Sequence, residues 1–238
     1  MQSKKRVPKP AKLKRKETKP DAPGKTPLKI GLTGNIGSGK STAALLFSEL
    51  GAMTFDTDSV GHELLESDPN IVSGIVEAFG KNVVINGLIS REILGRIVFS
   101  NPEKREKLES ILHPAIMSAI DRRLNQSDVC TYAVIEVPLL YEASLSGYFD
   151  YVILVKAEER SAIARASAKL GISEEDVLKR LNAQIPQSVK EKLADFTVAN
   201  DGSTEDLKKK VVLLHAVLSS LGSAVMRTTE PVPKSIHD

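Results

Sequence analysis

A glycine-rich loop between a strand pattern and a helix pattern is the feature of this sequence that most limits its fold. Residues 34–42 are Gly-Asn-Ile-Gly-Ser-Gly-Lys-Ser-Thr, with the spacing G-x-x-x-x-G-K-S. Residues 28–33 before it are typical of a buried strand, and the apolar residues 43–47 after it are typical of a helix. Gly34 and Gly39 allow backbone conformations that other residues avoid. The order of strand, loop and helix predicts the first unit of an α/β sheet.

The loop also has the composition of a phosphate-binding site. Backbone N–H groups in such a loop can point inward at an anion, and the N-terminus of the next helix adds partial positive charge there. Lys40 brings a full charge to the outer phosphates, and Ser41 offers a hydroxyl to Mg²⁺. The alternative is a glycine-rich turn that binds nothing. We predict nucleotide binding along the whole loop, through Gly34, Asn35, Ile36, Gly37, Ser38, Gly39, Lys40, Ser41 and Thr42.

The composition is that of an ordinary globular protein. Apolar residues make up 41% of the chain and charged residues 26%, and no apolar run has the length of a membrane span. The first residues contain no apolar signal segment, and the single cysteine, Cys130, excludes an intramolecular disulfide. These observations predict a protein of a reducing compartment, which we take to be the cytoplasm.

Positive charge is concentrated at the N-terminus. Residues 1–26 hold ten Lys/Arg and two acids, so their net charge is +8; the whole chain carries +3, which leaves −5 for the rest. We predict a disordered basic tail over residues 1–27, because this segment has almost no large apolar side chains. Its clusters at residues 4–6 and 14–16 fit a nuclear address, attachment to nucleic acid or an anionic membrane, or a solvated extension. The acidic body gives no sign of nucleic-acid binding.

Four further apolar runs of strand length follow the first, at residues 52–55, 131–137, 151–155 and 196–199. Helix patterns separate the runs, and the run at 151–155 is apolar throughout, as in a parallel strand buried on both faces. The sequence therefore predicts an α/β fold with a doubly wound five-stranded parallel sheet.

The predicted domain covers residues 28–220. Residues 60–125 are too long for a simple crossover, so we expect a helical substrate lobe there, with a turn at Asn86-Gly87 between short strands. Two helices within residues 158–192 are expected to form a lid. Residues 221–238 are predicted to be a flexible C-terminal tail.

Two acids follow the second predicted strand, where open α/β sheets place their chemistry. In Asp56-Thr57-Asp58, one carboxylate could hold a metal or take a proton. The alternative is capping of the next helix by Asp58 or Ser59. Glu136, at the end of the third strand, lies roughly where a second metal-binding acid would fall.

Several basic residues outside the loop have both a functional and a structural interpretation. Arg91 follows the predicted hairpin and could bind an anion or be a solvated helix residue, and His113 could contact a ligand or be structural. In the lid, Arg165, Lys169, Lys179 and Arg180 could close on a transferring phosphate or form a solvated basic face.

Taken together, these motifs resemble the dephospho-CoA kinase family. The similarity begins with residues 31–42, Leu50-Gly51 and Asp56-Thr57-Asp58. Further similar motifs follow in order at residues 87–91, 98–99, 108–114, 138–142, 184, 194–195 and 200–202. The resemblance covers residues 29–218 and leaves out the basic tail.

The resemblance implies a P-loop kinase that transfers the γ-phosphate of ATP to the ribose 3′-hydroxyl of dephospho-CoA, the final step of coenzyme A synthesis. It implies ATP and Mg²⁺, with Ser41 as the Mg²⁺ ligand. Catalytic roles would fall on Lys40, Asp58 and Lys169, with Asp58 as the base. ATP binding would extend from the loop to Arg165 and Asn200. The acceptor site would be bounded by Thr33, Asp58, Arg91, His113, Pro138 and Leu139.

The sequence departs from the family pattern at five positions. Ala162 stands where the lid pattern usually has a glutamine. Asn35 replaces the usual second glycine of the loop, and we expect its side chain to point away from the phosphates. Thr57 replaces an alanine between the two acids, and His62 replaces an arginine. Lys169 replaces a lid arginine, and because lysine lacks the bidentate guanidinium fork we expect slower catalysis. The alternative is a P-loop kinase of another nucleoside or small metabolite.

Two other classes of protein use similar loops. A GTP-driven switch is disfavoured because the chain has no Asn-Lys-x-Asp to recognise guanine. An ATPase that acts on nucleic acid would need the basic tail, so its activity would be lost when residues 1–26 are deleted.

Overall fold

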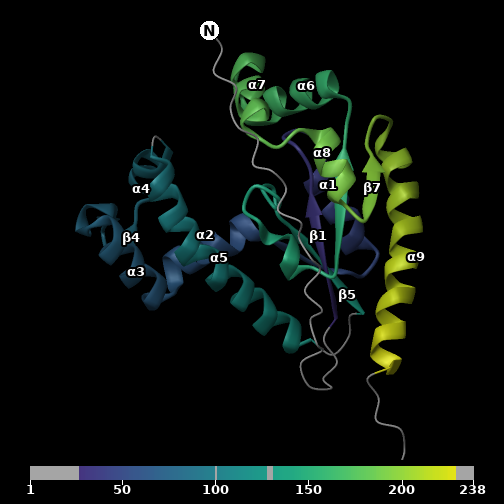
Figure 1. Cartoon of the computed structure of the whole chain (residues 1–238), viewed down its shortest axis with the longest axis horizontal. Helices are drawn as coiled ribbons and strands as arrows, with labels where there is room; N and C mark the ends of the chain where they lie inside the picture. The colour runs from purple at the N-terminus through teal and green to yellow at the C-terminus, as the bar shows by residue number, and fades with distance from the viewer. Residues whose placement is uncertain (1–26, 100, 128–130, 229–238) are drawn as a thin grey trace, which may run out of the picture.

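The computed structural model describes residues 27–99, 101–127 and 131–228, with side chains as far as residue 224. A parallel five-stranded sheet forms its centre, in the order β2-β5-β1-β6-β7 (Figure 1). The strands are β1 (Leu28–Thr33), β2 (Met53–Asp56), β5 (Tyr132–Glu136), β6 (Tyr151–Lys156) and β7 (Phe196–Ala199). All four neighbouring pairs are parallel, with Leu28 opposite Tyr132 and Ile30 opposite Tyr151. The predicted sheet is confirmed.

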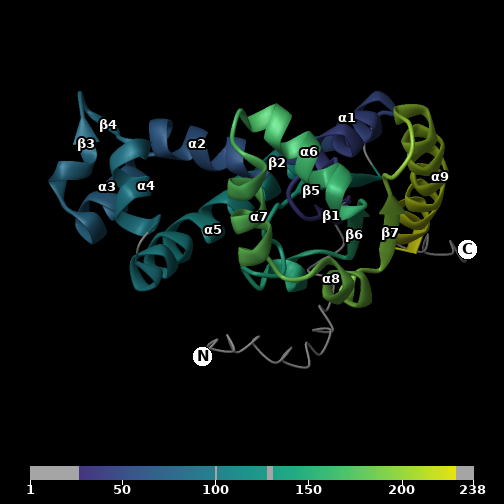
Figure 2. The ribbon, with the colours of Figure 1, turned by 90° about the horizontal axis from the view of Figure 1, so that it is seen from above.

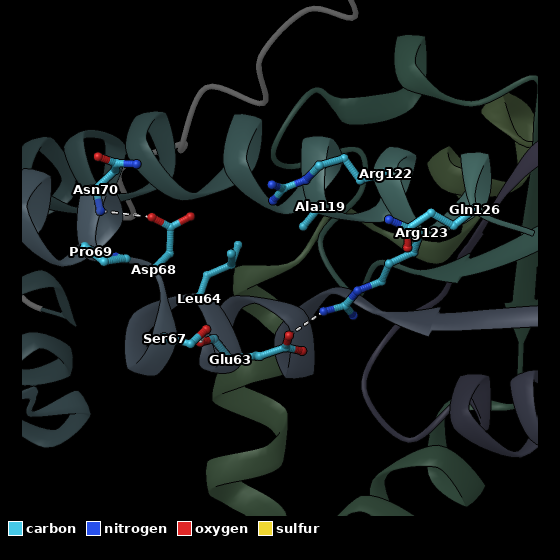
Figure 3. Close-up of a pocket in the computed structure, with 10 residues that line it drawn as sticks. All are labelled: Glu63, Leu64, Ser67, Asp68, Pro69, Asn70, Ala119, Arg122, Arg123 and Gln126. Carbon is cyan, nitrogen blue, oxygen red and sulfur yellow. Dashed lines mark hydrogen bonds and ion pairs between the residues drawn. The ribbon is translucent and has the colours of Figure 1, made fainter.

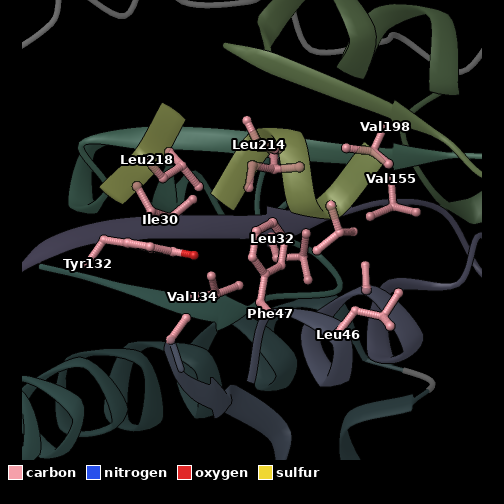
Figure 4. Packing of buried hydrophobic residues seen from close by; sticks show 14 of the residues in the cluster. Ile30, Leu32, Leu46, Phe47, Tyr132, Val134, Val155, Val198, Leu214 and Leu218 are labelled. Carbon is pink, nitrogen blue, oxygen red and sulfur yellow. The ribbon is translucent and has the colours of Figure 1, made fainter. Parts of the chain in front are cut away.

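Helices cover both faces of the sheet, as expected of a doubly wound fold. On one face, α1 (Lys40–Glu49) and α9 (Thr204–Thr228) pack against alternate strand residues, and Figure 4 shows this core. On the other face, α2 (Thr57–Ser67) and α5 (Pro102–Asn125) cover the intervening strand residues, such as Ala133, Ile135 and Val152. The central strands β1, β5 and β6 are largely apolar because both of their faces are buried, whereas the edge strands β2 and β7 are mostly only partly buried.

A separate lobe extends from one side of the sheet, away from α9 (Figures 1 and 2). Besides α2 and α5 it contains α3 (Pro69–Phe79), the 3₁₀ turn η1 (Lys81–Val83), strands β3 (Val84–Ile85) and β4 (Leu88–Ile89), and α4 (Arg91–Phe99). The lobe has its own small apolar core, built around Leu65, Ile75, Val83, Ile89 and Leu94. Asn86 and Gly87 both have positive φ, as a tight hairpin turn requires, so the predicted hairpin is confirmed.

Three helices follow β6 in the predicted lid segment, residues 158–192. They are α6 (Glu159–Leu170), α7 (Glu174–Ala183) and α8 (Gln187–Leu193), and a 3₁₀ turn, η2 (Leu145–Tyr148), precedes β6. The sequence predicted the first two helices and missed α8, because seven residues that begin after a proline carry little apolar periodicity.

The C-terminal helix is longer than predicted. The sequence placed a flexible tail from residue 221, but α9 continues through Gly222 to Thr228. A Cβ at Gly222 would overlap the backbone oxygen of Thr131, so this glycine permits close packing of α9 beside β5 and does not end the helix. The predicted basic tail at residues 1–26, the end of the chain from residue 229, and Cys130 all lie outside the described residues. In the described part of the chain, no helix is long and apolar enough to cross a membrane.

Candidate active site

The loop at residues 34–42, called the phosphate loop below, connects the carboxyl end of β1 to α1. Gly37 and Gly39 have φ angles of 73° and 95°, which favour glycine. A Cβ at Gly37 would overlap the backbone oxygen of Ala162 in α6, and one at Gly39 would overlap the side chain of Asn200. Both glycines are therefore required by backbone conformation and by close neighbours.

Lys40 lies inside the phosphate loop. Its side chain is buried, and its ammonium donates to the backbone oxygens of Gly34, at 3.1 Å, and Asn35, at 3.3 Å. Burial lowers the pKa of Lys40, and the carboxylate of Glu136 opposes this effect. The loop thus holds a cation where the outer phosphates of a nucleotide would bind.

Ser41 of the phosphate loop lies next to Glu136 at the end of β5. The hydroxyl of Ser41 donates to Oε1 of Glu136 at 3.1 Å. Burial raises the pKa of Glu136, whereas the hydrogen bond from Ser41 and the charge of Lys40 lower it. Mg²⁺ prefers oxygen ligands and usually takes one or two carboxylates together with substrate phosphates, so this pair fits a magnesium ion. The sequence had suggested Glu136 only through its strand position, and parallel alignment of β5 with β1 brings it to Ser41.

The structure separates the roles of the two acids after β2. Asp56 is the N-cap of α2: its carboxylate accepts from the backbone N–H of Asp58 at 3.0 Å and from the Ser59 hydroxyl at 2.8 Å. The predicted alternative, capping by Asp58 or Ser59, is wrong. Because Asp56 caps the helix, the carboxylate of Asp58 is available for other contacts. Loss of solvation and the charge of Asp56 raise the pKa of Asp58, against the lowering effect of His62 and Lys40.

A pocket of about 290 Å³ opens beside Asp58, between α2, α4 and α5. It brings three predicted residues together, Asp58, Arg91 and His113. We call it the acceptor pocket. Its other polar lining residues are Thr57, His62, Arg105 and Glu109, and its apolar ones include Leu65, Leu94, Leu112 and Ile116.

Sequence reasoning missed Arg105 in this pocket. The signal was present, because Arg105 precedes His113 by eight residues, which places both on one face of a helix. Its guanidinium lies 3.9 Å from the carboxylate of Glu109 and remains largely exposed. Arg91 and Arg105 thus both line the pocket.

Thr33, Pro138 and Leu139, which the resemblance assigned to the acceptor, do not line this pocket. Thr33 is fully buried, and its hydroxyl donates to the backbone oxygen of Pro138 at 3.5 Å. Leu139 is largely exposed. Thr33 and Pro138 thus connect the ends of β1 and β5.

The lid segment and the end of β7 contact the other side of the phosphate loop. Nδ2 of Asn200 donates to the backbone oxygen of Ser38 at 2.9 Å, and the guanidinium of Arg165 donates to the backbone oxygen of Asn200 at 3.3 Å. Lys169 is close enough to lower the pKa of both Lys40 and Glu136, although burial has the larger effect on each group. Of the four predicted lid cations, Arg165 thus contacts a residue that holds the phosphate loop, and Lys169 acts on the site through its charge. Lys179 is exposed and pairs with Glu175 and Asp176 of its own helix instead.

A second hollow, of about 480 Å³, lies further along α2 and α5 and contains none of the predicted site residues. Figure 3 shows Arg123 paired with Glu63, and Arg122 extending over the floor formed by Leu64 and Ala119. Asp68 at its edge caps α3. The predicted site residues Asp58, Arg91 and His113 therefore line the smaller pocket and not this hollow.

A nucleotide loop that shares an edge of a parallel sheet with a carboxylate and an acceptor pocket defines a P-loop kinase of small molecules. The family model for dephospho-CoA kinase matches residues 28–206. The chain belongs to the dephospho-CoA kinase family.

Individual relatives agree with this assignment. The chain is 35% identical over 188 residues to a dephospho-CoA kinase of Carboxydothermus hydrogenoformans, covering 78% of this chain and 91% of the relative. It is 38% identical over 190 residues to that of Nitrosospira multiformis, covering 79% and 94%. The crystal structure of TT1252 from Thermus thermophilus superposes with a TM-score of 0.71 at 36% identity, over 83% of this chain and 99% of that one. A dephospho-CoA kinase from Campylobacter jejuni gives a TM-score of 0.56 at 28% identity, over 81% and 97%.

Proposed function

We propose that this protein transfers the γ-phosphate of ATP to the ribose 3′-hydroxyl of dephospho-CoA and so forms coenzyme A. Family membership supports the reaction class. The observation that carries the residue assignment is the carboxylate of Asp58, left available by the Asp56 cap and placed between the phosphate loop and the acceptor pocket.

The roles of the residues follow from their positions. The backbone of the phosphate loop and Lys40 would bind the ATP phosphates, and Lys169 would add positive charge from the lid segment. Asp58 would accept the proton of the ribose hydroxyl as that oxygen bonds to the γ-phosphorus and ADP departs. Asp58 needs no strongly raised pKa, because in a loose transition state the proton leaves late.

Ser41 and Glu136 would hold Mg²⁺, which when bound neutralises phosphate charge. The chemistry of both side chains supports this role, because each offers an oxygen and both lie next to Lys40.

The acceptor pocket supports an anionic acceptor. Dephospho-CoA carries a diphosphate, and two arginines, Arg91 and Arg105, line this pocket and could bind it. His113 and the apolar floor would bound the remainder of the acceptor. We also place the reaction in the cytoplasm, in line with the expectation from the single cysteine.

An acceptor panel tests this proposal. Purified full-length protein is incubated with ATP, Mg²⁺ and, separately, dephospho-CoA, adenosine or other nucleosides, and the site of phosphorylation is determined by NMR. We expect the highest kcat/KM for dephospho-CoA, with the phosphate on the 3′-oxygen. Preference for another nucleoside or metabolite would overturn the acceptor assignment and leave the ATP site in place. The variant Lys40→Ala controls for contaminating kinases.

A further inference from the structure

Each of the residues 35–38 in the phosphate loop is held by a segment outside the loop. Nδ2 of Asn35 donates to the backbone oxygen of Ile185 at 3.5 Å, and the backbone N–H of Ile36 donates to Oε1 of Gln184 at 2.9 Å. Gly37 abuts Ala162, and Ser38 accepts the hydrogen bond from Asn200. Residues 184–186, which we call the arm, connect α7 to α8 and make the first two contacts.

The arm is itself anchored by a buried ion pair. The backbone N–H of Ile185 donates to Oε1 of Glu142 at 2.9 Å, and the ammonium of Lys190 lies 2.8 Å from the same oxygen. Lys190 has no exposed surface, and the side chain of Glu142 is 18% exposed. One carboxylate oxygen thus joins the arm, helix α8 and the loop that follows β5.

Such a pair calls for an explanation beyond stability. Two buried charges cost desolvation energy that their attraction only partly offsets, and apolar residues of similar volume often stabilise a fold as well or better. An ion pair does something that apolar residues cannot do, because it fixes direction and distance. Glu142 uses this directionality to orient the backbone of Ile185 and therefore the neighbouring Gln184.

The buried polar atoms of this region that lack partners support the same interpretation. Four buried side-chain atoms have no hydrogen-bond partner within the described residues: Asn35 Oδ1, Ser38 Oγ, Tyr141 OH and Glu142 Oε2. Two of them lie in the phosphate loop, one belongs to the Glu142 anchor, and Tyr141 is the chain neighbour of Glu142. Buried polar atoms without partners are rare and concentrate where a structure serves function.

We propose that Gln184, Glu142 and Lys190 form a clamp that holds the phosphate loop in the shape that binds ATP. They are positioning residues: they act through the loop backbone and touch no reacting atom. Asn35 adds a contact to the arm that the glycine usual at this position cannot make. The proposal rests on the proposed function only in taking ATP as the nucleotide.

Electrostatic contact with Lys40 supports this role. Burial lowers the pKa of Lys40 most strongly, and the charge of Lys190 lowers it further. Removal of the Lys190 charge would therefore change the field around the phosphate-binding cation as well as the position of the arm.

The test measures binding of MgATP to the full-length chain by calorimetry, without an acceptor. Gln184→Met keeps the side-chain length and removes the acceptor of the Ile36 N–H. Loss of one hydrogen bond predicts a rise of about three- to tenfold in Kd and in the KM for ATP. The KM for the acceptor should not change, whereas a general loss of structure would affect both.

Two further variants address the ion pair. Lys190→Met leaves Glu142 buried without its cation, and we expect Kd to rise by about tenfold or more. Adding Glu142→Gln removes the unpaired charge and keeps an oxygen for Ile185, so the double variant should recover part of the affinity. The matched control is Glu191→Gln, which breaks the neighbouring ion pair between α8 and Lys156 and should leave Kd unchanged.

The outcomes separate this inference from the proposed function. Folded Gln184→Met and Lys190→Met proteins with wild-type Kd and a lower unfolding temperature would overturn the clamp and show a purely structural role. If Lys190→Met does not fold, Gln184→Met decides alone, because its side chain is only partly buried. A wild-type chain that binds no MgATP would overturn the proposed function, and the clamp with it.

Discussion

The phosphate loop and the acceptor pocket meet at Asp58 but are built in opposite ways. The loop is held by segments from the arm, α6 and β7, and its cation is buried. The acceptor pocket is open and lies between three helices of the lobe, with exposed cations such as Arg105 at its side. The loop backbone is therefore held in one shape before any ligand binds, whereas exposed side chains of the pocket still have rotamer freedom.

This comparison predicts different failures on the two sides. A change in the loop should damage ATP binding and catalysis together. A change in the pocket should lower kcat or raise the KM for the acceptor, and should leave ATP binding unchanged.

The largest effect is expected for Lys40→Ala, because it removes the buried cation from the loop. We expect kcat/KM for ATP to fall by on the order of 10³-fold or more, with MgATP binding lost in calorimetry. Near-normal MgATP affinity in a folded variant would contradict the central role of the loop.

Asp58→Asn should reduce catalysis and leave the binding of MgATP to the phosphate loop intact. Removal of a general base typically costs about 10²–10⁴-fold in rate. We expect that loss in kcat, with the Kd for MgATP nearly unchanged, measured by product formation and calorimetry on the same preparation. Wild-type turnover would remove Asp58 from the mechanism.

Arg105→Ala should raise the KM for dephospho-CoA by about tenfold through loss of a charge-assisted contact, and leave the KM for ATP unchanged. The matched control is Arg122→Ala, a guanidinium on the same helix that lines the other hollow (Figure 3). An equal effect of the two substitutions would show that overall charge, and not the pocket, is being measured.

The pH dependence gives a smaller effect. Asp58 must be ionised to accept a proton, so kcat/KM should fall as pH falls through its pKa, which lies above the ordinary aspartate value of 3.8. Asp56 is one cause of this elevation, so Asp56→Asn should move the acidic limb of the profile to lower pH. Asparagine can still cap α2, which keeps the helix intact. An unmoved limb would show that another group controls it.

Deletion of residues 1–26 should have the smallest effect. If the acceptor is a free metabolite, kcat and both KM values stay the same, because the loop and pocket lie in the described domain. Loss of turnover on deletion would instead favour an ATPase that works through the basic tail.

Much of the sheet was predictable from sequence because parallel strands buried on both faces give continuous apolar runs. Residues 28–33 were predicted as a strand with the bounds that β1 has, and the phosphate loop has a fixed spacing. Relations between distant segments were harder. The contact of Ser41 with Glu136 depends on strand register, and the choice of Asp56 over Asp58 as the cap depends on the residue at which α2 begins.

Other features were not predicted because one residue type can have more than one structural role. Gly222 suggested a helix end, but a glycine also allows two backbones to approach, and here it lets α9 pass Thr131. The ion pair of Glu142 and Lys190 joins residues 48 positions apart, and neither residue signals its burial in sequence. Such pairs can be recognised only when the fold brings their elements together.

The contact between Gly37 and Ala162 has a consequence for how this chain can evolve. Any side chain at residue 37 would strike the backbone of α6, so a mutation there cannot be absorbed within the loop and would displace the lid segment as well. Substitutions at residue 37 are therefore prevented by Ala162, a neighbour 125 residues away in the sequence. Tolerating one would require the whole of α6 to shift.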